Sequence, residues 1–312
     1  MDVLAGLLEG PRARGAFMIR ALFDPPWSVR IADEAPLSVM VMVRGTAWIA
    51  PAGGGPAQCI RPGDLAIARG PDPYTCADEA TTAPFAEIGP GQRCRPLDGA
   101  PVARYQDLGP RAWGESPDAA VEMLIGTYPL QGEITGRLLD ALPPLLVLPG
   151  EVWECPLTPL VAEEIGKDEP GQAVVLDRLL DLLLIAALRA WFSRPEAAAP
   201  AWYRALGDPV VGRALRLLQD DPAHPWTIAG LAAKTGVSRA ALARRFAGLV
   251  GEPPMTYLTN WRLALAADLL RDSELTIAAI ARRVGYGSAF ALSGAFKRVY
   301  GVSPQEHRGR AA

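Results

Sequence analysis

Arg239, Arg244 and Arg245 lie on a stretch of the chain whose apolar spacing predicts a helix. Ser238 precedes them and is expected to cap that helix. Arg239 falls in the first turn and Arg244 about one and a half turns later, so both can share one exposed side. A guanidinium can donate two hydrogen bonds to O6 and N7 of guanine, or bind a phosphate through its charge. The stretch therefore predicts contact with duplex DNA.

A second stretch, 50 positions later, is chemically weaker. The positions that match the three arginines hold Ala289, Gly294 and Ala295. The candidate DNA-contacting residues that remain there are Ser288, Phe290, Ser293, Lys297 and Arg298. Hydroxyl and cationic side chains suit phosphates, whereas an aromatic ring would either contact a thymine methyl or lie in the core. We expect the first stretch to lead base recognition.

Both stretches belong to a pattern that occurs twice between residues 227 and 308. In the first copy, Ile228, Leu231 and Ala232 stand at i, i+3 and i+4, and residues of similar type recur 49 positions later. This spacing predicts a helix with one buried stripe. Gly236, which also recurs, can supply the positive φ that ends such a helix. Each copy is therefore predicted to form helix, turn, helix, a layout whose second helix enters the major groove.

Residues 253–271 lie between the two copies and are expected to form one helix, opened by prolines. Its length is about 27 Å at ~1.5 Å per residue. A rigid rod of that order can set two recognition helices into successive major grooves, which lie roughly 34 Å apart. Four apolar residues are expected to pack this rod against both motifs: Tyr257, Trp261, Ala264 and Leu265.

Residues 208–308 resemble the DNA-binding domain of AraC/XylS-type bacterial transcription regulators. The resemblance rests on the two motifs, the linking helix and the closing run from Gly285-Tyr286 to Ser303-Pro304. Residues 1–195 resemble the cupin-type sensor domain found in one branch of these regulators, and 208–312 would form the DNA-binding domain. The resemblance implies double-stranded DNA, a small-molecule effector and RNA polymerase as partners, and a homodimer.

The N-terminal part predicts β-structure followed by helices, so the fold class is α+β with a cupin-like β-barrel. Short apolar runs alternate with Gly- and Pro-rich turns, which is typical of a barrel or sandwich. A Gly-rich hairpin loop and a Pro-Gly-Asp turn occur in the order seen in cupins. The expected strands are 27–31, 38–49, 58–60, 65–68, 85–88 and 121–128. The expected helices before the first motif are 3–8, 136–142, 159–165, 172–192 and 209–220.

Helix 172–192 is apolar over most of its circumference and must be covered on more than one side. It would be either a deeply buried core helix or a helix packed both on its own barrel and on a partner subunit. Helices in this part dimerise AraC-type sensors, so the resemblance favours the second interpretation. We assign Leu184 and Leu188 to the partner-facing surface.

Five residues on or next to the expected strands are candidates for ligand binding: Trp27, Trp48, Arg69, Tyr74 and Tyr128. An interior lined by aromatic rings with one guanidinium would suit a small organic anion or an aromatic molecule. The alternative is that these are ordinary core and rim residues.

Metal chemistry is not expected in the sensor domain. The only two histidines of the chain, His224 and His307, lie in its C-terminal third, so the sensor domain lacks the histidine cluster of metal-binding cupins. Relatives in this branch often carry a histidine pair where this chain has Arg69 and Tyr74, and a cysteine where it has Ile125. The chain is expected to be no enzyme and to need no cofactor. Two alternatives stay open: a metal-free cupin-fold enzyme, and a ligand-independent architectural DNA binder.

Charge and cysteine content fit a regulator. Residues 208–312 hold 14 Lys and Arg against 8 Asp and Glu, whereas the remainder holds 17 against 26. A basic domain on an acidic protein suits phosphate binding at one end only. The four cysteines show no C-x-x-C spacing, so neither a zinc site nor a disulfide framework is expected. Cys76 and Cys94 are expected to be structural, and a redox pair is the alternative. The start of the chain does not resemble a signal peptide, and the apolar run 182–188 is too short to span a bilayer, so we expect a cytoplasmic protein.

Overall fold

The structure, a computed structural model, describes residues 17–97, 105–128, 132–153, 155–194 and 199–311. The helix expected at 3–8 lies outside these residues. The chain divides into two compact units. One contains all the strands with the helices α3 (Leu157–Ile165) and α4 (Gln172–Phe192). The other contains α2 (Glu133–Leu139) and every helix from α5 (Ala201–Ala205) onward.

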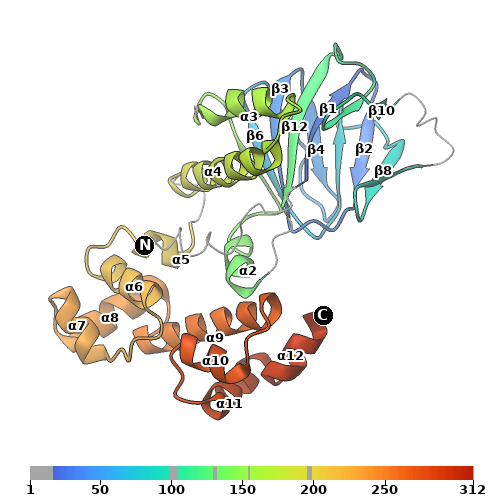
Figure 1. Cartoon of the computed structure of the whole chain (residues 1–312). Helices are drawn as coiled ribbons and strands as arrows, with labels where there is room; N and C mark the ends of the chain where they lie inside the picture. Colours follow the sequence, from blue (N-terminus) through green and yellow to red (C-terminus); the bar gives the residue numbers. More distant parts are fainter. Residues whose placement is uncertain (1–16, 98–104, 129–131, 154, 195–198, 312) are drawn as a thin grey trace. The chain divides into compact units, whose positions relative to one another are not determined.

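The β unit consists of two sheets (Figure 1). The seven-stranded sheet runs in the order β10 (Gln106–Asp107), β11 (Ala112–Gly114), β1 (Phe17–Phe23), β12 (Val121–Tyr128), β3 (Leu37–Arg44), β6 (Leu65–Arg69) and β13 (Leu145–Leu148). The six-stranded sheet runs in the order β5 (Gln58–Ile60), β4 (Ala47–Pro51), β7 (Tyr74–Ala77), β2 (Ser28–Ile31), β8 (Ala86–Gly89) and β9 (Arg93–Pro96). The α+β class is confirmed. Among the described residues the sheets do not close into a barrel, which corrects that part of the expectation.

The expected strand 38–49 is in fact two strands, β3 and β4, which belong to different sheets. The chain turns at Gly45, whose φ is 76°. A Cβ atom added there would lie 2.8 Å from the carbonyl oxygen of Ala120. Both the positive φ and the close approach require glycine, so the turn that separates the sheets depends on this residue.

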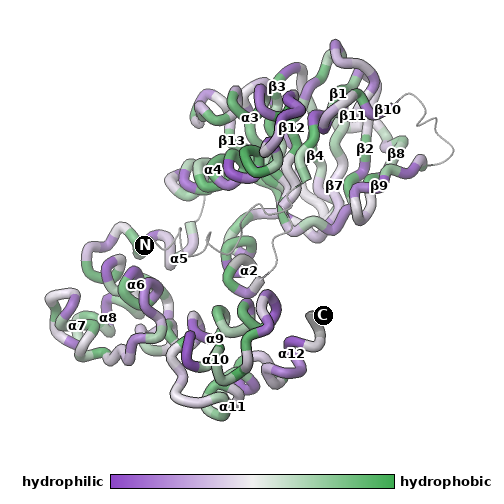
Figure 2. The backbone as a smooth tube through the Cα atoms, viewed as in Figure 1, coloured by the Kyte–Doolittle hydropathy of each residue, from purple (hydrophilic) through white to green (hydrophobic). Residues whose placement is uncertain are grey.

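Helix α4 packs directly on β12. A Cβ atom at Gly126 would lie 2.8 Å from Cδ2 of Leu180, so the missing side chain lets the helix approach the strand. The hydroxyl of Tyr128 donates a hydrogen bond of 2.8 Å to the carbonyl oxygen of Leu180. Leu184 and Leu188 are 1% and 0% exposed in the single chain, so assigning them to a partner-facing surface was wrong. Figure 2 shows many hydrophobic positions along α4 itself.

The helical unit continues with α6 (Val211–Asp220), α7 (Ile228–Thr235), α8 (Arg239–Val250), α9 (Pro254–Asp272), α10 (Ile277–Arg283), α11 (Ala289–Tyr300) and α12 (Pro304–Ala311). The two expected helix-turn-helix pairs are α7–α8 and α10–α11 (Figure 1). Thr227 and Thr276 cap the first helix of each pair by accepting N–H groups at 3.0 and 3.2 Å. Gly236 has a φ of 74° at the first turn, as expected.

Helix α9 joins the two helix-turn-helix pairs through two hydrophobic cores. Tyr257 and Trp261 are buried among side chains of α7 and α8. Leu263 and Leu270 are buried among side chains of α10 and α11. Leu265 packs against both cores, as its spacing predicted. One rod therefore positions both recognition helices, α8 and α11.

Candidate nucleic-acid interface and sensor cavity

Helix α8 exposes Arg239 and Arg244, and neither forms an ion pair with any residue that the structure describes. Ser238 caps the helix, because its hydroxyl accepts the N–H of Ala241 at 3.2 Å. The side chains of Arg239 and Arg244 are exposed, while Leu242 on the same helix is fully buried. Free guanidinium groups on the outer side of a capped helix can reach base edges or phosphates.

Arg245 differs from the other two arginines, because it is held within the chain. Its Nη2 lies 2.7 Å from Oδ2 of Asp208, and its Nε donates to the same oxygen over 2.8 Å. Asp208 also accepts the N–H groups of Val210 and Val211, both at 2.9 Å, at the start of α6. This carboxylate therefore orients α8 against α6. Sequence reasoning missed Asp208, since nothing in its spacing relates it to the motif.

Helix α11 presents a mainly apolar outer surface at its N-terminal end. Ser288 caps it by accepting the N–H of Ala291 at 3.1 Å. Phe290, in the first turn, is 90% exposed and lies outside the hydrophobic core. A Cβ atom at Gly294 would meet no other atom within 4 Å, so the glycine does not serve close packing within the chain. The cations Lys297 and Arg298 are exposed further along, and Ser293 is half-buried.

Comparisons with known proteins cover both units of the chain. A cupin family model matches residues 2–193, and a helix-turn-helix domain model matches residues 231–310. An AraC-like transcription regulator of Streptomyces lividans is 33% identical over 314 residues, which cover 99% of this chain and 98% of that protein. The regulator AlkR of Acinetobacter baylyi is 36% identical over 177 residues, 55% of this chain and 58% of that protein.

The chain belongs to the AraC family of transcription regulators. The regulators it matches are named for transcriptional control, so the chain is a regulator and no enzyme. Among solved structures, the DNA-binding domain of AdpA in complex with a target DNA is 32% identical. That match covers 33% of this chain and 93% of the AdpA domain, with a TM-score of 0.32. Within the described residues, no helix is long and apolar enough to cross a membrane.

The cupin-like unit of this AraC-family chain contains an apolar cavity of about 150 Å³. Its walls come from both sheets and include Trp27, Tyr74, Met123 and Ile125. The polar groups at the cavity include Asp33, whose carboxylate accepts a 2.8 Å hydrogen bond from Gln92. A cavity of this size and character, about 150 Å³, can hold a molecule as large as benzene.

The structure separates the five ligand-binding candidates. Trp27 and Tyr74 line the cavity. Arg69 lines a second cavity, of about 100 Å³, to which Tyr74 also contributes. Trp48 lies on β4 and lines neither cavity, and Tyr128 is fully buried against α4. No Lys or Arg is found among the described residues that line the 150 Å³ cavity.

Trp27 has an unsatisfied hydrogen-bond donor. Its ring is 0% exposed, stacks on Phe23 with centroids 4.5 Å apart, and lines the cavity. Its Nε1 has no hydrogen-bond partner in the described part of the chain. A buried N–H without an acceptor costs roughly 1–3 kcal/mol, so a ligand oxygen that accepted this bond would gain affinity.

Two cysteines line the cavity, Cys76 and Cys94, and neither is activated as a thiolate. Cys76 is buried, and its Sγ lies 3.8 Å from Sδ of Met40. Burial raises the pKa of the Cys76 thiol to about 12, and burial also raises the pKa of Cys94. Both thiols are therefore protonated at neutral pH, which favours the structural role expected for them. The described residues contain no cluster of three or more His, Cys, Asp or Glu side chains suited to a metal.

Proposed function

We propose that this AraC-family regulator recognises duplex DNA mainly through α8, with Arg239 and Arg244 as base readers. The observation that carries this proposal is the exposure of both guanidinium groups on the outer side of a capped helix. Arg245 acts in support, because its pairing with Asp208 fixes the orientation of α8. Ser238 would contact the phosphate backbone beside its capping role.

Helix α11 would contribute less to base recognition and more to backbone contact. Lys297 and Arg298 would bind phosphates, together with Ser288 and Ser293. Phe290 would contact the C5-methyl group of a thymine, because an exposed ring at the start of a recognition helix has no other apolar partner in the described chain. The half-site beneath α11 would therefore tolerate more base substitutions than the half-site beneath α8.

The test of this proposal begins with a duplex selected from a random library with the purified protein. Arg244→Ala is expected to weaken binding to that duplex by about 1–3 kcal/mol and to relax preference at one base pair. Arg213→Ala is the matched control, because Arg213 is an exposed arginine on α6, outside both motifs. Equal losses for the two variants at fixed salt, with unchanged base preference, would contradict the proposal.

For the cupin-like unit we propose a small, mostly apolar effector with one hydrogen-bond acceptor. The apolar walls select against charged molecules, since burying an ion without a partner is costly. The Nε1 of Trp27, which has no partner among the described residues, favours an oxygen acceptor. The ligand class that we propose is therefore a neutral ketone, ether or alcohol, in place of the organic anion expected from the sequence. An aromatic molecule, the other class expected from the sequence, remains a candidate.

Cyclohexanone and methylcyclohexane form a matched pair of probes, because they differ in a carbonyl against a methyl group. Binding is followed through the indole N–H resonance of Trp27, assigned by comparison with Trp27→Phe. Cyclohexanone is expected to bind more tightly and to shift this resonance downfield. In Trp27→Phe the preference over methylcyclohexane should disappear. Equal affinity of both probes for the unaltered protein would contradict the assignment of Trp27.

We further propose a homodimer through α4, with RNA polymerase as a partner at promoters and a cytoplasmic location. The apolar residues that α4 leaves exposed are Val174, Val175 and Leu182. They replace Leu184 and Leu188 as the candidates for partner contact. A ligand-independent architectural DNA binder is the competing function, and a cavity that takes up neither probe would favour it.

A further inference from the structure

Helix α2 packs with the DNA-binding helices although its sequence neighbours belong to the β unit. It lies in the chain between β12 and β13, yet it forms one compact unit with the helices from α5 onward. Ile134 on α2 is 4% exposed and belongs to the same hydrophobic core as Trp261 and Phe246. A short insertion from the sensor half of the chain thus completes the core of the first motif.

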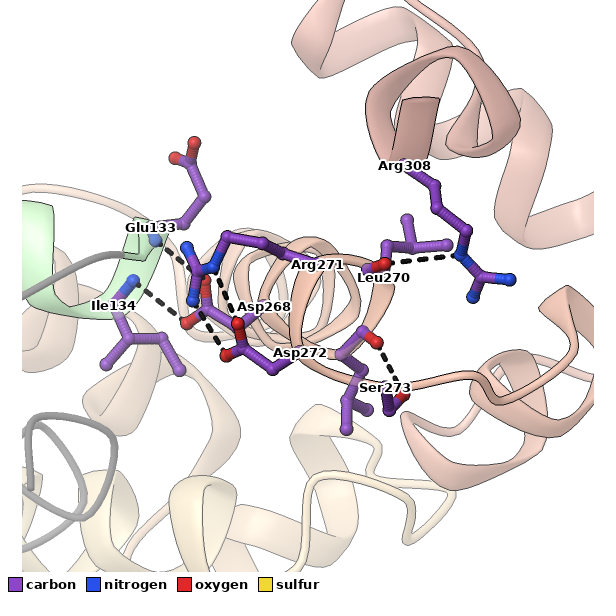
Figure 3. Close-up of polar contacts among 9 residues, drawn as sticks. Glu133, Ile134, Asp268, Leu270, Arg271, Asp272, Ser273 and Arg308 are labelled. Carbon is purple, nitrogen blue, oxygen red and sulfur yellow. Dashed lines mark hydrogen bonds and ion pairs between the residues drawn. The ribbon is translucent and has the colours of Figure 1, made fainter. Parts of the chain in front are cut away.

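Asp268 of α9 caps the N-terminus of α2 (Figure 3). Its Oδ1 accepts the N–H of Glu133 at 2.7 Å, and its Oδ2 accepts the N–H of Ile134 at 3.3 Å. The residue at the usual capping position is Gly132, which has no side chain to do this. The free N–H groups of α2 are therefore satisfied by a carboxylate about 135 residues away in sequence.

Two further contacts hold α2 on α9. Nη2 of Arg137 donates to the carbonyl oxygen of Asn260 over 3.2 Å. Arg271 holds Asp268 in place, with Nη1 3.6 Å from Oδ1, while its Nε donates to Asp272 over 2.7 Å (Figure 3). The cap, the buried Ile134 and the Arg137 bond span both ends of α2, so the helix is docked along its length.

The chain connects this docked helix to the cavity. Met123, Ile125 and Thr127 of β12 line the cavity, and β12 ends at Tyr128. Glu133 follows Tyr128 by five positions in the chain, a span of at most about 18 Å when fully extended. A shift of β12 on filling of the cavity would therefore act on α2 through a short tether.

We propose that α2 transmits the state of the sensor cavity to α9, and through α9 to the placement of α8 and α11. This proposal rests on the proposed ligand binding and DNA recognition. Helix α9 forms part of both hydrophobic cores. A change in the docking of α2 on α9 would therefore alter the placement of α8 relative to α11. By reciprocity, DNA binding must then change the docking of α2.

Asp268→Ala in the full chain tests the docking, with Asp272→Ala as the matched control. Both variants remove a carboxylate that pairs with Arg271, but the described contacts join only Asp268 to α2. Hydrogen exchange of the 133–139 amides is expected to quicken about fivefold or more in Asp268→Ala, the loss of one cap. In Asp272→Ala it should change less than about twofold.

The same variants test the transmission. Affinity for the selected duplex is expected to change by about fivefold or more in Asp268→Ala, and much less in Asp272→Ala. Duplex binding should also alter exchange at 133–139 in the unaltered protein. Faster exchange in Asp268→Ala with unchanged DNA affinity would overturn the proposal, because α2 would then be passive packing. Unchanged exchange in Asp268→Ala would overturn the docking itself.

Failure of the proposed function has a different signature. If the unaltered protein bound no selected duplex, the DNA-recognition proposal would fail. Hydrogen exchange at 133–139 on addition of cyclohexanone would then show whether α2 responds to the cavity. If cyclohexanone did not bind, the proposed ligand class would be wrong, and hydrogen exchange at 133–139 on addition of the duplex would test the coupling of α2 to the DNA-binding helices. A bound probe, confirmed at the Trp27 resonance, that left exchange at 133–139 unchanged would also refute transmission from the cavity.

Discussion

Gly294→Arg should both stabilise α11 and strengthen DNA binding. Gly294 is exposed in the interior of α11, and the added Cβ atom would meet no atom within 4 Å. Glycine costs about 1 kcal/mol relative to alanine in a helix, and arginine costs little, so the gain is roughly 0.5–1 kcal/mol. For a unit of about 100 residues this corresponds to an increase in Tm of about 2–6 °C.

The same substitution places a cation on the outer side of the recognition helix. If α11 lies along the phosphate backbone, one more phosphate is neutralised, and the slope of log K against log salt should steepen by about 0.9. The assay is fluorescence anisotropy with the selected duplex at four or more salt concentrations, with Tm measured in parallel.

Gly309→Arg is the control, because Gly309 is exposed, meets no atom within 4 Å of an added Cβ, and lies on α12 outside both motifs. It adds the same charge to the protein. Weaker binding by Gly294→Arg with an intact Tm would refute the reasoning, because it would mean that the glycine permits close approach of α11 to DNA.

Three further outcomes are expected. Replacing a thymine by deoxyuridine beneath α11 should weaken binding by about 1 kcal/mol or less in the unaltered protein, and should have no effect in Phe290→Ala; an equal loss in both would exclude a methyl contact. Leu182→Glu should convert a dimer into a folded monomer by light scattering, whereas Leu160→Glu, which changes an equally exposed leucine on α3 outside that surface, should not; a dimer that persists in the Leu182 variant would place the interface elsewhere. Elemental analysis of the dialysed full chain should find well under one transition metal per chain, since no histidine precedes His224; a stoichiometric metal would contradict this.

The sequence by itself determined the helical unit closely. Caps, apolar spacing and turn glycines are local signals, because each depends on residues within about four positions of one another. Ser238, Leu231 and Gly236 therefore have the roles expected of them. The period of the repeat added the one long-range fact that was needed, namely that a second unit of the same kind exists.

Only the tertiary structure decided which distant residues meet. Sequence spacing could not place Asp208 on Arg245, bring Asp268 to the start of α2, or divide 38–49 between two sheets. It also could not separate Trp27 and Tyr74 from Tyr128, because each is an aromatic residue on or beside a strand. The physical reason is that a contact between positions far apart in sequence depends on how whole elements pack. Local patterns fix which surfaces are apolar, but packing selects which of them face a cavity, a helix or solvent.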